Sequence, residues 1–173
     1  MAAAIGRLPA GGGVVVRHTD DRARRDLAKR LQPLCRARRL WLLIAGDWRL
    51  AAALRANGVH APEAMIRRGL PPGLRLWLRT RNGRLTAAAH SEIALRRAAR
   101  ARADAVMVGP VLPTASHPDR APLGRVRFAA LARAASRPAI ALGGIGPDTM
   151  RQLNGIGCWG AAGVGFAGRA IRT

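Results

Sequence analysis

Two glycine-rich stretches near the end of the sequence could bind phosphate. Gly143-Gly-Ile-Gly146 and Gly163-Val-Gly-Phe-Ala-Gly168 each lie at the end of an apolar run. Glycine leaves backbone N–H groups accessible, and such groups hold phosphate where a strand ends and a helix begins. The second stretch also matches a dinucleotide-binding motif by letter, but it lacks the second strand and the acidic residue about 20 residues later that such a site requires. We expect phosphate binding at both stretches; the alternative, that the glycines only form tight turns, stays open.

Side chains in or beside apolar runs are the other candidates for chemistry. Arg17 ends the run Val14-Val-Val, and a guanidinium there suits a pyrophosphate or an aromatic ring. His60 ends a short strand-like run and is a further candidate. Cys35 and Cys158 lie far apart, and two such residues predict neither a disulfide framework nor a zinc site.

The chain is strongly basic. Of 173 residues, 30 are basic and 9 are acidic, which gives a formal net charge of +21 and makes nucleic acid the first partner to consider. Every basic residue except Lys29 is an arginine, and the arginines are spread along the whole chain, as in the products of GC-rich genes. Aromatic residues make up 3%, so platforms for base stacking are scarce. We expect no specific nucleic-acid partner; an arginine-rich polyanion-binding protein stays as an alternative.

The composition is that of a globular domain. Hydrophobic residues make up 49% and charged residues 23%. No apolar run reaches the roughly 18–20 residues that a membrane span needs. The first residues lack the basic and apolar regions of a secretory signal, and the cysteine usage is typical of a reducing compartment. We expect one domain over residues 1–173, located in the cytoplasm, with no membrane partner.

Strand-like and helix-like segments alternate along the chain. The predicted strands are Gly13–His18, Leu40–Ala45, Gly58–His60, Leu74–Leu78, Ala105–Gly109, Ala139–Gly143 and Trp159–Val164. The predicted helices follow Asp20, run over Trp48–Ala56 and Glu63–Arg68, begin after Ser91, run over Arg125–Ala135, and begin at Pro147. This alternation predicts an α/β fold with a parallel sheet. Seven strands are one fewer than a closed barrel requires, so we expect a TIM-type (β/α) barrel that lacks its first strand or has it truncated.

A series of short motifs resembles a known family. The motifs are Ala56-Asn-Gly-Val-His60, Val108-Gly-Pro-Val-Leu-Pro-Thr114, Pro122-Leu-Gly124, Pro138-Ala-Ile-Ala-Leu-Gly-Gly-Ile145 and Gly160-Ala-Ala-Gly-Val-Gly165. In this order and at these spacings they resemble the thiamine-phosphate synthase/TenI family. The resemblance implies a (β/α) barrel with a role in thiamine biosynthesis. The synthase branch joins a pyrimidine pyrophosphate to a thiazole phosphate and releases pyrophosphate with magnesium, whereas the TenI branch aromatises a thiazole phosphate tautomer.

The resemblance also implies site residues. Arg17 matches the family's arginine on the pyrimidine side, and His117 stands where the family has a loop lysine that meets pyrophosphate. We expect these two residues to serve catalysis. The residues expected to bind phosphate or substrate are Thr114, Gly143, Gly144, Ile145, Gly165, Phe166, Ala167 and Gly168.

The chain departs from both branches at their marker residues. The two aspartates that hold magnesium in the synthase branch correspond to Gly46 and Met65, and the catalytic histidine of the TenI branch corresponds to Pro110. Asp47, one place after Gly46, is the remaining metal-ligand candidate, with Glu63 near the second position. A magnesium cofactor is therefore expected only if the family reaction is retained. A non-catalytic phosphate- or thiazole-phosphate-binding relative is the alternative. Because a missing first strand leaves an open sheet edge, we expect either a homo-oligomer or a start site placed too late in the gene.

Overall fold

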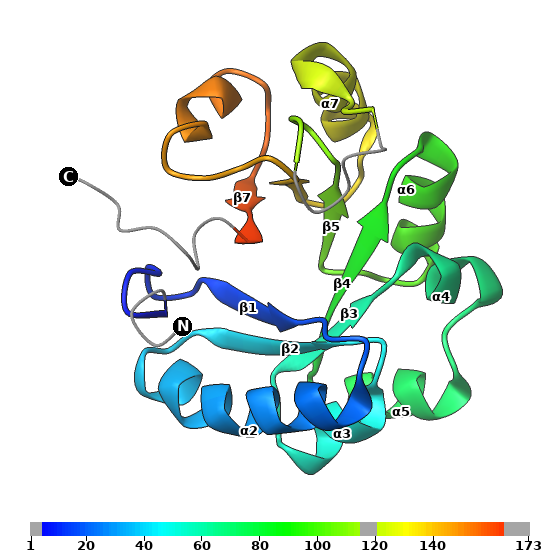
Figure 1. Cartoon of the computed structure of the whole chain (residues 1–173). Helices are drawn as coiled ribbons and strands as arrows, with labels where there is room; N and C mark the ends of the chain where they lie inside the picture. The colour runs from blue at the N-terminus through cyan, green and yellow to red at the C-terminus, as the bar shows by residue number, and fades with distance from the viewer. Residues whose placement is uncertain (1–4, 115–120, 165–173) are drawn as a thin grey trace. The chain divides into compact units, whose positions relative to one another are not determined.

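Seven parallel strands alternate with helices in the computed structural model, which describes residues 5–114 and 121–164 (Figure 1). The strands are β1 (Gly13–Val16), β2 (Trp41–Ala45), β3 (Gly58–Ala61), β4 (Arg84–Ala89), β5 (Ala105–Val108), β6 (Ala139–Leu142) and β7 (Gly160–Ala162). Their order in the sheet is their order in the chain. This is the topology of a TIM-type (β/α) barrel without its first strand, and it confirms the predicted fold class. The chain forms two compact units, Met1–Thr86 and Ala87–Thr173.

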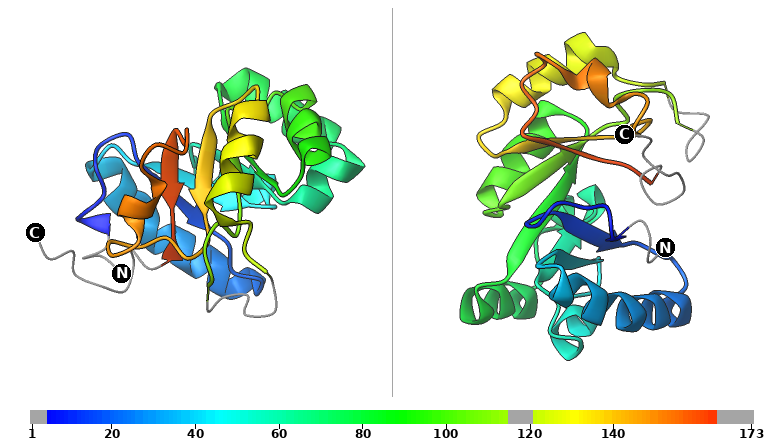
Figure 2. Two further views of the ribbon diagram at one scale, coloured as in Figure 1. Left: turned by 90° about the horizontal axis from the view of Figure 1, so that it is seen from above. Right: turned by 90° about the vertical axis from the view of Figure 1, so that its left-hand side faces the viewer.

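In the first unit, β1, β2 and β3 pair in parallel register, with Val16 opposite Ile44 and Ala45 opposite His60. Helix α2 (Asp21–Ala37) begins where the side chain of Asp20 accepts a hydrogen bond from the backbone N–H of Ala23. Helices α2 and α3 (Trp48–Ala53) pack against these strands, as the views in Figure 2 show. The unit also contains α4 (Glu63–Arg68), as predicted.

Close packing of β3 against β4 requires a glycine at position 58. A Cβ atom built on Gly58 would lie 2.0 Å from the carbonyl oxygen of Arg84. Any side chain there would therefore push the two strands apart. The backbone N–H of Arg84 donates to the carbonyl of Asn57 at 2.9 Å, which fixes the start of β4 beside the start of β3.

The prediction of a strand over Leu74–Leu78 is wrong, because these residues lie in helix α5 (Pro72–Arg81). Pro72 occupies the first turn of the helix, where its missing N–H costs nothing. A strand would place Leu74 and Leu76 on one face, yet Leu74 is fully buried and Leu76 is 62% exposed. The fourth strand is instead Arg84–Ala89, which the sequence did not suggest because alanine is a poor strand former and the strand is mostly buried on both faces.

In the second unit, β5, β6 and β7 pair in parallel, and α6 (Glu92–Arg100) and α7 (Gly124–Ala134) follow β4 and β5. Ser91 caps α6 through a hydrogen bond from the N–H of Ala94, as predicted. The helix predicted to begin at Pro147 is absent from the described residues; a turn leads instead to the short 3-10 helix η1 (Met150–Leu153). The extended backbone of Asn154 ends η1, and Gly155 and Gly157 follow it with positive φ.

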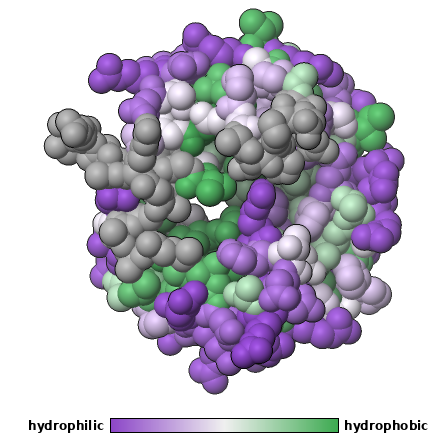
Figure 3. Space-filling view, in the orientation of Figure 1, coloured by the Kyte–Doolittle hydropathy of each residue, from purple (hydrophilic) through white to green (hydrophobic). Residues whose placement is uncertain are grey.

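Hydrophilic residues cover much of the face shown in Figure 3, in keeping with the high content of arginine. Among the described residues, no helix is both long and apolar enough to cross a membrane.

Candidate functional site

Arg17 directly follows β1 at the carboxyl end of the strand and is exposed. In (β/α) barrels, the loops after the strands carry the functional groups. The positive charge of Arg17 is one cause of the lowered pKa of His60, the third residue of β3. The two sequence-based candidates Arg17 and His60 thus lie close enough in the first unit for the charge of Arg17 to lower the pKa of His60.

His60 is held in its neutral form. Burial, with the positive charge of Arg17 as a second cause, lowers the pKa of His60 to about 4. Its Nδ1 lies 3.0 Å from the hydroxyl oxygen of Thr86 in β4. At neutral pH the ring is thus an uncharged hydrogen-bonding group beside a cation, and it is suited to contact a polar ring rather than to neutralise an anion.

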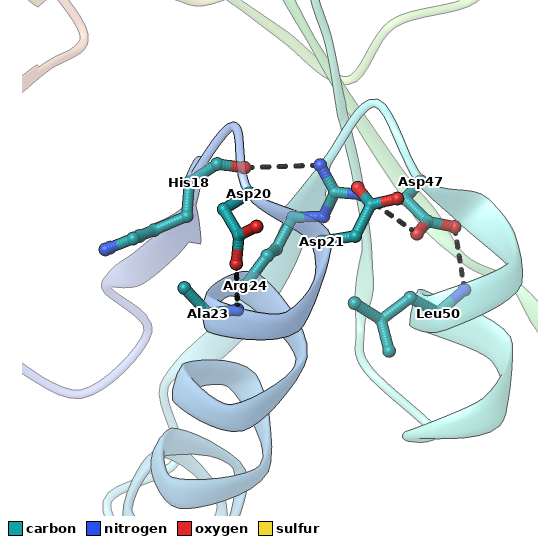
Figure 4. Close-up of polar contacts among 7 residues, drawn as sticks. All are labelled: His18, Asp20, Asp21, Ala23, Arg24, Asp47 and Leu50. Carbon is teal, nitrogen blue, oxygen red and sulfur yellow. Dashed lines mark hydrogen bonds and ion pairs between the residues drawn. The ribbon is translucent and has the colours of Figure 1, made fainter.

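Arg24 in the first turns of α2 connects the loops that follow β1 and β2 (Figure 4). Its guanidinium donates to the carbonyl of His18 at 3.2 Å and to the carboxylate of Asp47 at 3.3 Å, and it also pairs with Asp21. The Arg24 side chain is only 14% exposed, so these contacts are formed in a partly desolvated setting. Sequence reasoning missed Arg24, since nothing in the chain marks a contact between residues 23 positions apart.

Asp47, the metal-ligand candidate, is occupied by structural contacts. One carboxylate oxygen accepts a hydrogen bond from the N–H of Leu50 at 2.9 Å and caps α3, while the other faces Arg24. A guanidinium so close disfavours a divalent cation at the same carboxylate. Magnesium prefers several hard oxygen ligands in octahedral geometry.

The other positions of the family's metal site do not supply such ligands. Gly46 has no side chain and Met65 offers a thioether, while Glu63, in the first turn of α4, already has an interaction partner. Among the described residues there is no group of three or more His, Cys, Asp or Glu side chains that could hold a metal ion. The residues present therefore do not fit a magnesium ion of the kind that the resemblance implies.

In the second unit, the loop Gly143–Ile145 follows β6 and lies against the loop that follows β5. A Cβ atom on Gly143 would lie 2.6 Å from Pro110, and one on Gly144 would lie 2.5 Å from the carbonyl oxygen of Pro113. Both glycines have positive φ, +93° and +68°. The N–H of Leu112 donates to the carbonyl of Gly143 at 3.1 Å, which joins the two loops. These positions need glycine for both space and conformation.

The same loop presents unpaired donors. Within the described part of the chain, the backbone N–H groups of Gly144 and Ile145 have no hydrogen-bond acceptor. The hydroxyl of Thr149 fixes the loop, because it donates to the carbonyl of Gly144 at 2.8 Å and accepts from the N–H of Gly146 at 2.9 Å. Sequence reasoning did not single out Thr149. Unpaired N–H groups on a fixed loop can bind an anionic oxygen.

The remaining predicted site residues are placed only in part. Thr114, after β5, is half-buried and has an interaction partner. His117, Gly165, Phe166, Ala167 and Gly168 lie outside the described residues. His90, which is not among the predicted site residues, is held by a hydrogen bond between its Nδ1 and the carbonyl of Gly109, the residue after β5.

Comparisons with known proteins agree with this arrangement of strands and loops. Residues 8–166 match the family model described as thiamine monophosphate synthase. The thiamine-phosphate synthase of Laribacter hongkongensis is 32% identical over 164 residues, which cover 90% of this chain and 73% of that protein. The thiamine-phosphate synthase of Bordetella pertussis is 31% identical over 177 residues, which cover 94% and 78%.

A solved structure shows the same fold. The thiamine phosphate pyrophosphorylase from Pyrococcus furiosus superimposes with a TM-score of 0.72 at 21% identity, over 94% of this chain and 76% of that one. The sequence matches extend across both units and include the glycine loop after β6. The chain therefore belongs to the thiamine monophosphate synthase family.

Proposed function

We propose that this protein binds phosphorylated thiazole through the loop Gly143–Ile145 and that it retains the scaffold of a thiamine-phosphate synthase without the family's metal site. One observation carries the first part: Gly144 and Ile145 present unpaired N–H groups on a loop that glycine conformation and Thr149 hold in place. Backbone donors of this kind favour a phosphate without requiring any particular side chain.

The reaction proposed from family membership is a substitution at the pyrimidine methylene carbon. The bond from this carbon to the pyrophosphate oxygen breaks, and the pyrophosphate leaves with the electron pair. The thiazole nitrogen then donates its lone pair to the carbon to form the new C–N bond. The main demand on the protein is to stabilise negative charge on the leaving group. We assign this role to Arg17 and His117, with the hydroxyl of Thr114 as a further donor to phosphate.

His60 complements Arg17 in this proposal. Because burial keeps the imidazole neutral, His60 adds no charge to the site and offers a hydrogen bond to the pyrimidine side. Arg17 is then the charged group beside His60 that is proposed to stabilise the leaving pyrophosphate.

A calorimetric panel tests the binding proposal. Thiazole phosphate, thiamine phosphate and inorganic pyrophosphate are titrated into the full chain, with and without magnesium. We expect both phosphorylated thiazole compounds to bind with affinities that magnesium does not change. Failure of thiazole phosphate and thiamine phosphate to bind would overturn the proposal.

A non-catalytic phosphate-binding relative is the second candidate, and the absence of a carboxylate pair at positions 46 and 65 favours it. Both candidates predict binding, so turnover distinguishes them.

The expectation of a cytoplasmic, homo-oligomeric protein is part of the same proposal. The polyanion-binding alternative would require affinity for nucleic acid or heparin that exceeds the affinity for thiazole phosphate.

A further inference from the structure

A cavity of about 290 Å³ lies in the first unit at the amino-terminal end of β2, the opposite end of the strand from Asp47. Its wall includes three arginines, Arg36 in the last turn of α2, Arg39 just after that helix, and Arg55 just after α3. The volume is just below the range for drug-sized small-molecule sites, about 300–1,000 Å³, so the cavity suits a smaller ligand.

The cavity is electrostatically uncompensated. Among the described residues that line it, none is acidic. Nor do the side chains of Arg36, Arg39 and Arg55 form an ion pair or hydrogen bond with any other residue that the structure describes. Three solvent-exposed arginines without a described protein partner therefore line one concave surface.

Two of these arginines, Arg39 and Arg55, have an unusual backbone conformation at the ends of their helices. Arg39 and Arg55 have φ values of 54° and 49°, the left-handed conformation that usually requires glycine at the end of a helix. The N–H of Leu40 donates to the carbonyl of Cys35 at 2.8 Å, and the N–H of Ala56 donates to the carbonyl of Ala51 at 2.8 Å. Both helices thus end in the same way, with an arginine at a position where glycine would adopt the left-handed conformation at a lower free-energy cost.

The conformation alone does not mark a site, because Arg102 adopts it after α6 with a φ of 57°. Arg102 does not line the cavity. The distinguishing feature is the convergence of Arg36, Arg39 and Arg55 on one cavity, and Arg102 is a matched control for the two arginines with strained backbone.

The carbonyl ends of α2 and α3 carry partial negative charge, which offsets only part of the positive charge of the three arginines. Each helix carbonyl end is equivalent to roughly half a negative charge, so α2 and α3 together contribute about one negative charge against three positive ones. Some of their last carbonyls are also occupied by the hydrogen bonds described above. The cavity therefore retains a net positive potential.

The cavity floor adds no negative charge. Cys35 is 1% exposed, and burial raises the pKa of its thiol, so the sulfur stays protonated. The side-chain oxygen of Asn57 accepts from the N–H of Leu42 at 2.8 Å, which turns the amide group so that its nitrogen stays available as a donor.

We propose that this cavity is a second anion-binding site, for a small phosphate-bearing molecule, at the amino-terminal end of β2, the end of the strand away from the loop that carries Asp47. A phosphate or pyrophosphate has enough oxygens to contact several guanidinium groups at once, whereas a carboxylate can occupy only one or two. The cavity thus selects a phosphate group over a simple carboxylate.

The test uses substitutions that do not endanger folding. Arg39→Gly together with Arg55→Gly removes two guanidinium groups and places glycine where the helix ends favour it. Arg102→Gly together with Arg79→Gln removes the same number of charges from positions outside the cavity. Arg17→Gln reports on the proposed active site. Inorganic pyrophosphate, inorganic phosphate and acetate are titrated into each full-length variant, and melting curves confirm folding.

We expect pyrophosphate to bind at two sites in the unmodified protein. The Arg39→Gly/Arg55→Gly variant should lose one site, with affinity there reduced about tenfold or more for each lost charged donor group, while Arg17→Gln should weaken only the other. The Arg102→Gly/Arg79→Gln control should change the pyrophosphate affinities of both sites by less than about threefold. Equal weakening in the cavity variant and the control would overturn the proposal, because net charge alone would then explain binding. So would tight binding of acetate that the cavity variant does not change.

Discussion

Gly144 shows how one residue can decide whether the phosphate loop forms. Its φ of +68° and the 2.5 Å separation between a built Cβ and the carbonyl oxygen of Pro113 exclude any side chain without rearrangement. Gly146, two residues later, has open space around its Cα. The two glycines therefore form a matched pair within one loop.

We predict that Gly144→Ala lowers the free energy of unfolding by about 1–3 kcal/mol, because alanine is strained at positive φ and contacts the loop after β5. It should also weaken thiazole phosphate binding, whereas Gly146→Ala should change neither by much. Thermal denaturation and calorimetry of both variants provide the measurement. Equal behaviour of the two would show that the loop does not depend on Gly144.

His60 makes stability depend on pH. Its pKa is about 4 in the folded protein and about 6.5 in an unfolded chain, so the unfolded state binds more protons between these values. The contribution of neutral, buried His60 to the free energy of unfolding is present in full above about pH 6.5, and it is lost as the pH falls toward 4. A shift of this size corresponds to at most about 3 kcal/mol.

We predict that His60→Gln flattens the decrease in stability between pH 6.5 and 4, as measured by urea denaturation across that range. His18→Gln is the control, because His18 is exposed. An unchanged slope in His60→Gln would contradict the assignment.

At the scale of elements, Asp47 and Arg24 organise the loops after β1 and β2. We predict that Asp47→Ala destabilises the protein by about 1–2 kcal/mol, because α3 loses its cap and Arg24 loses a partner. Asp47→Asn keeps an oxygen for the cap and should cost less. Chemical denaturation of the two variants, with and without magnesium, is the measurement. If magnesium stabilised the unmodified protein but neither variant, Asp47 would be a metal ligand instead.

The elements also show where sequence reasoning succeeds. Runs of β-branched and leucine residues marked β1, β2 and β5, and the caps Asp20 and Ser91 marked the starts of α2 and α6. It failed at β4, where alanine follows Leu85-Thr86 and no alternation marks the strand. It also failed at α5, where leucines two residues apart imitate a strand.

The candidate site was predictable only where local motifs define it. The glycine loop after β6 and the position of Arg17 at the end of β1 follow from short sequence patterns. The ion pair of Arg24 with Asp47 and the contact of His60 with Thr86 join different elements, so no local pattern could have revealed them. Burial, which keeps His60 neutral, is likewise a product of the fold.

For the whole molecule, the number of strands bears on assembly. β1 begins and β7 ends the strand order, and a barrel of this class uses eight strands rather than seven. Unpaired strand edges favour association with another chain. We predict a homo-oligomer, to be tested by light scattering coupled to size-exclusion chromatography. A monodisperse monomer over a hundredfold range of concentration would contradict this prediction.

The missing metal ligands determine what we expect of catalysis. Removing one well-placed stabilising group costs roughly 10²–10³ in rate, and here two positions, Gly46 and Met65, lack the carboxylates that the resemblance implies. A Cβ on Gly46 would meet nothing closer than Pro62 at 3.9 Å, so an aspartate fits there. Asp is also among the residues that tolerate the φ of +71° best.

The most direct test is the rate of thiamine phosphate formation from pyrimidine pyrophosphate and thiazole phosphate, measured with magnesium and again with excess chelator. We predict slow or absent turnover in the unmodified protein, with no effect of the chelator, and a magnesium-dependent gain in the variant Gly46→Asp/Met65→Asp. Rapid synthesis by the unmodified protein that the chelator abolishes would contradict the account, and Asp47 would then be the first ligand to substitute.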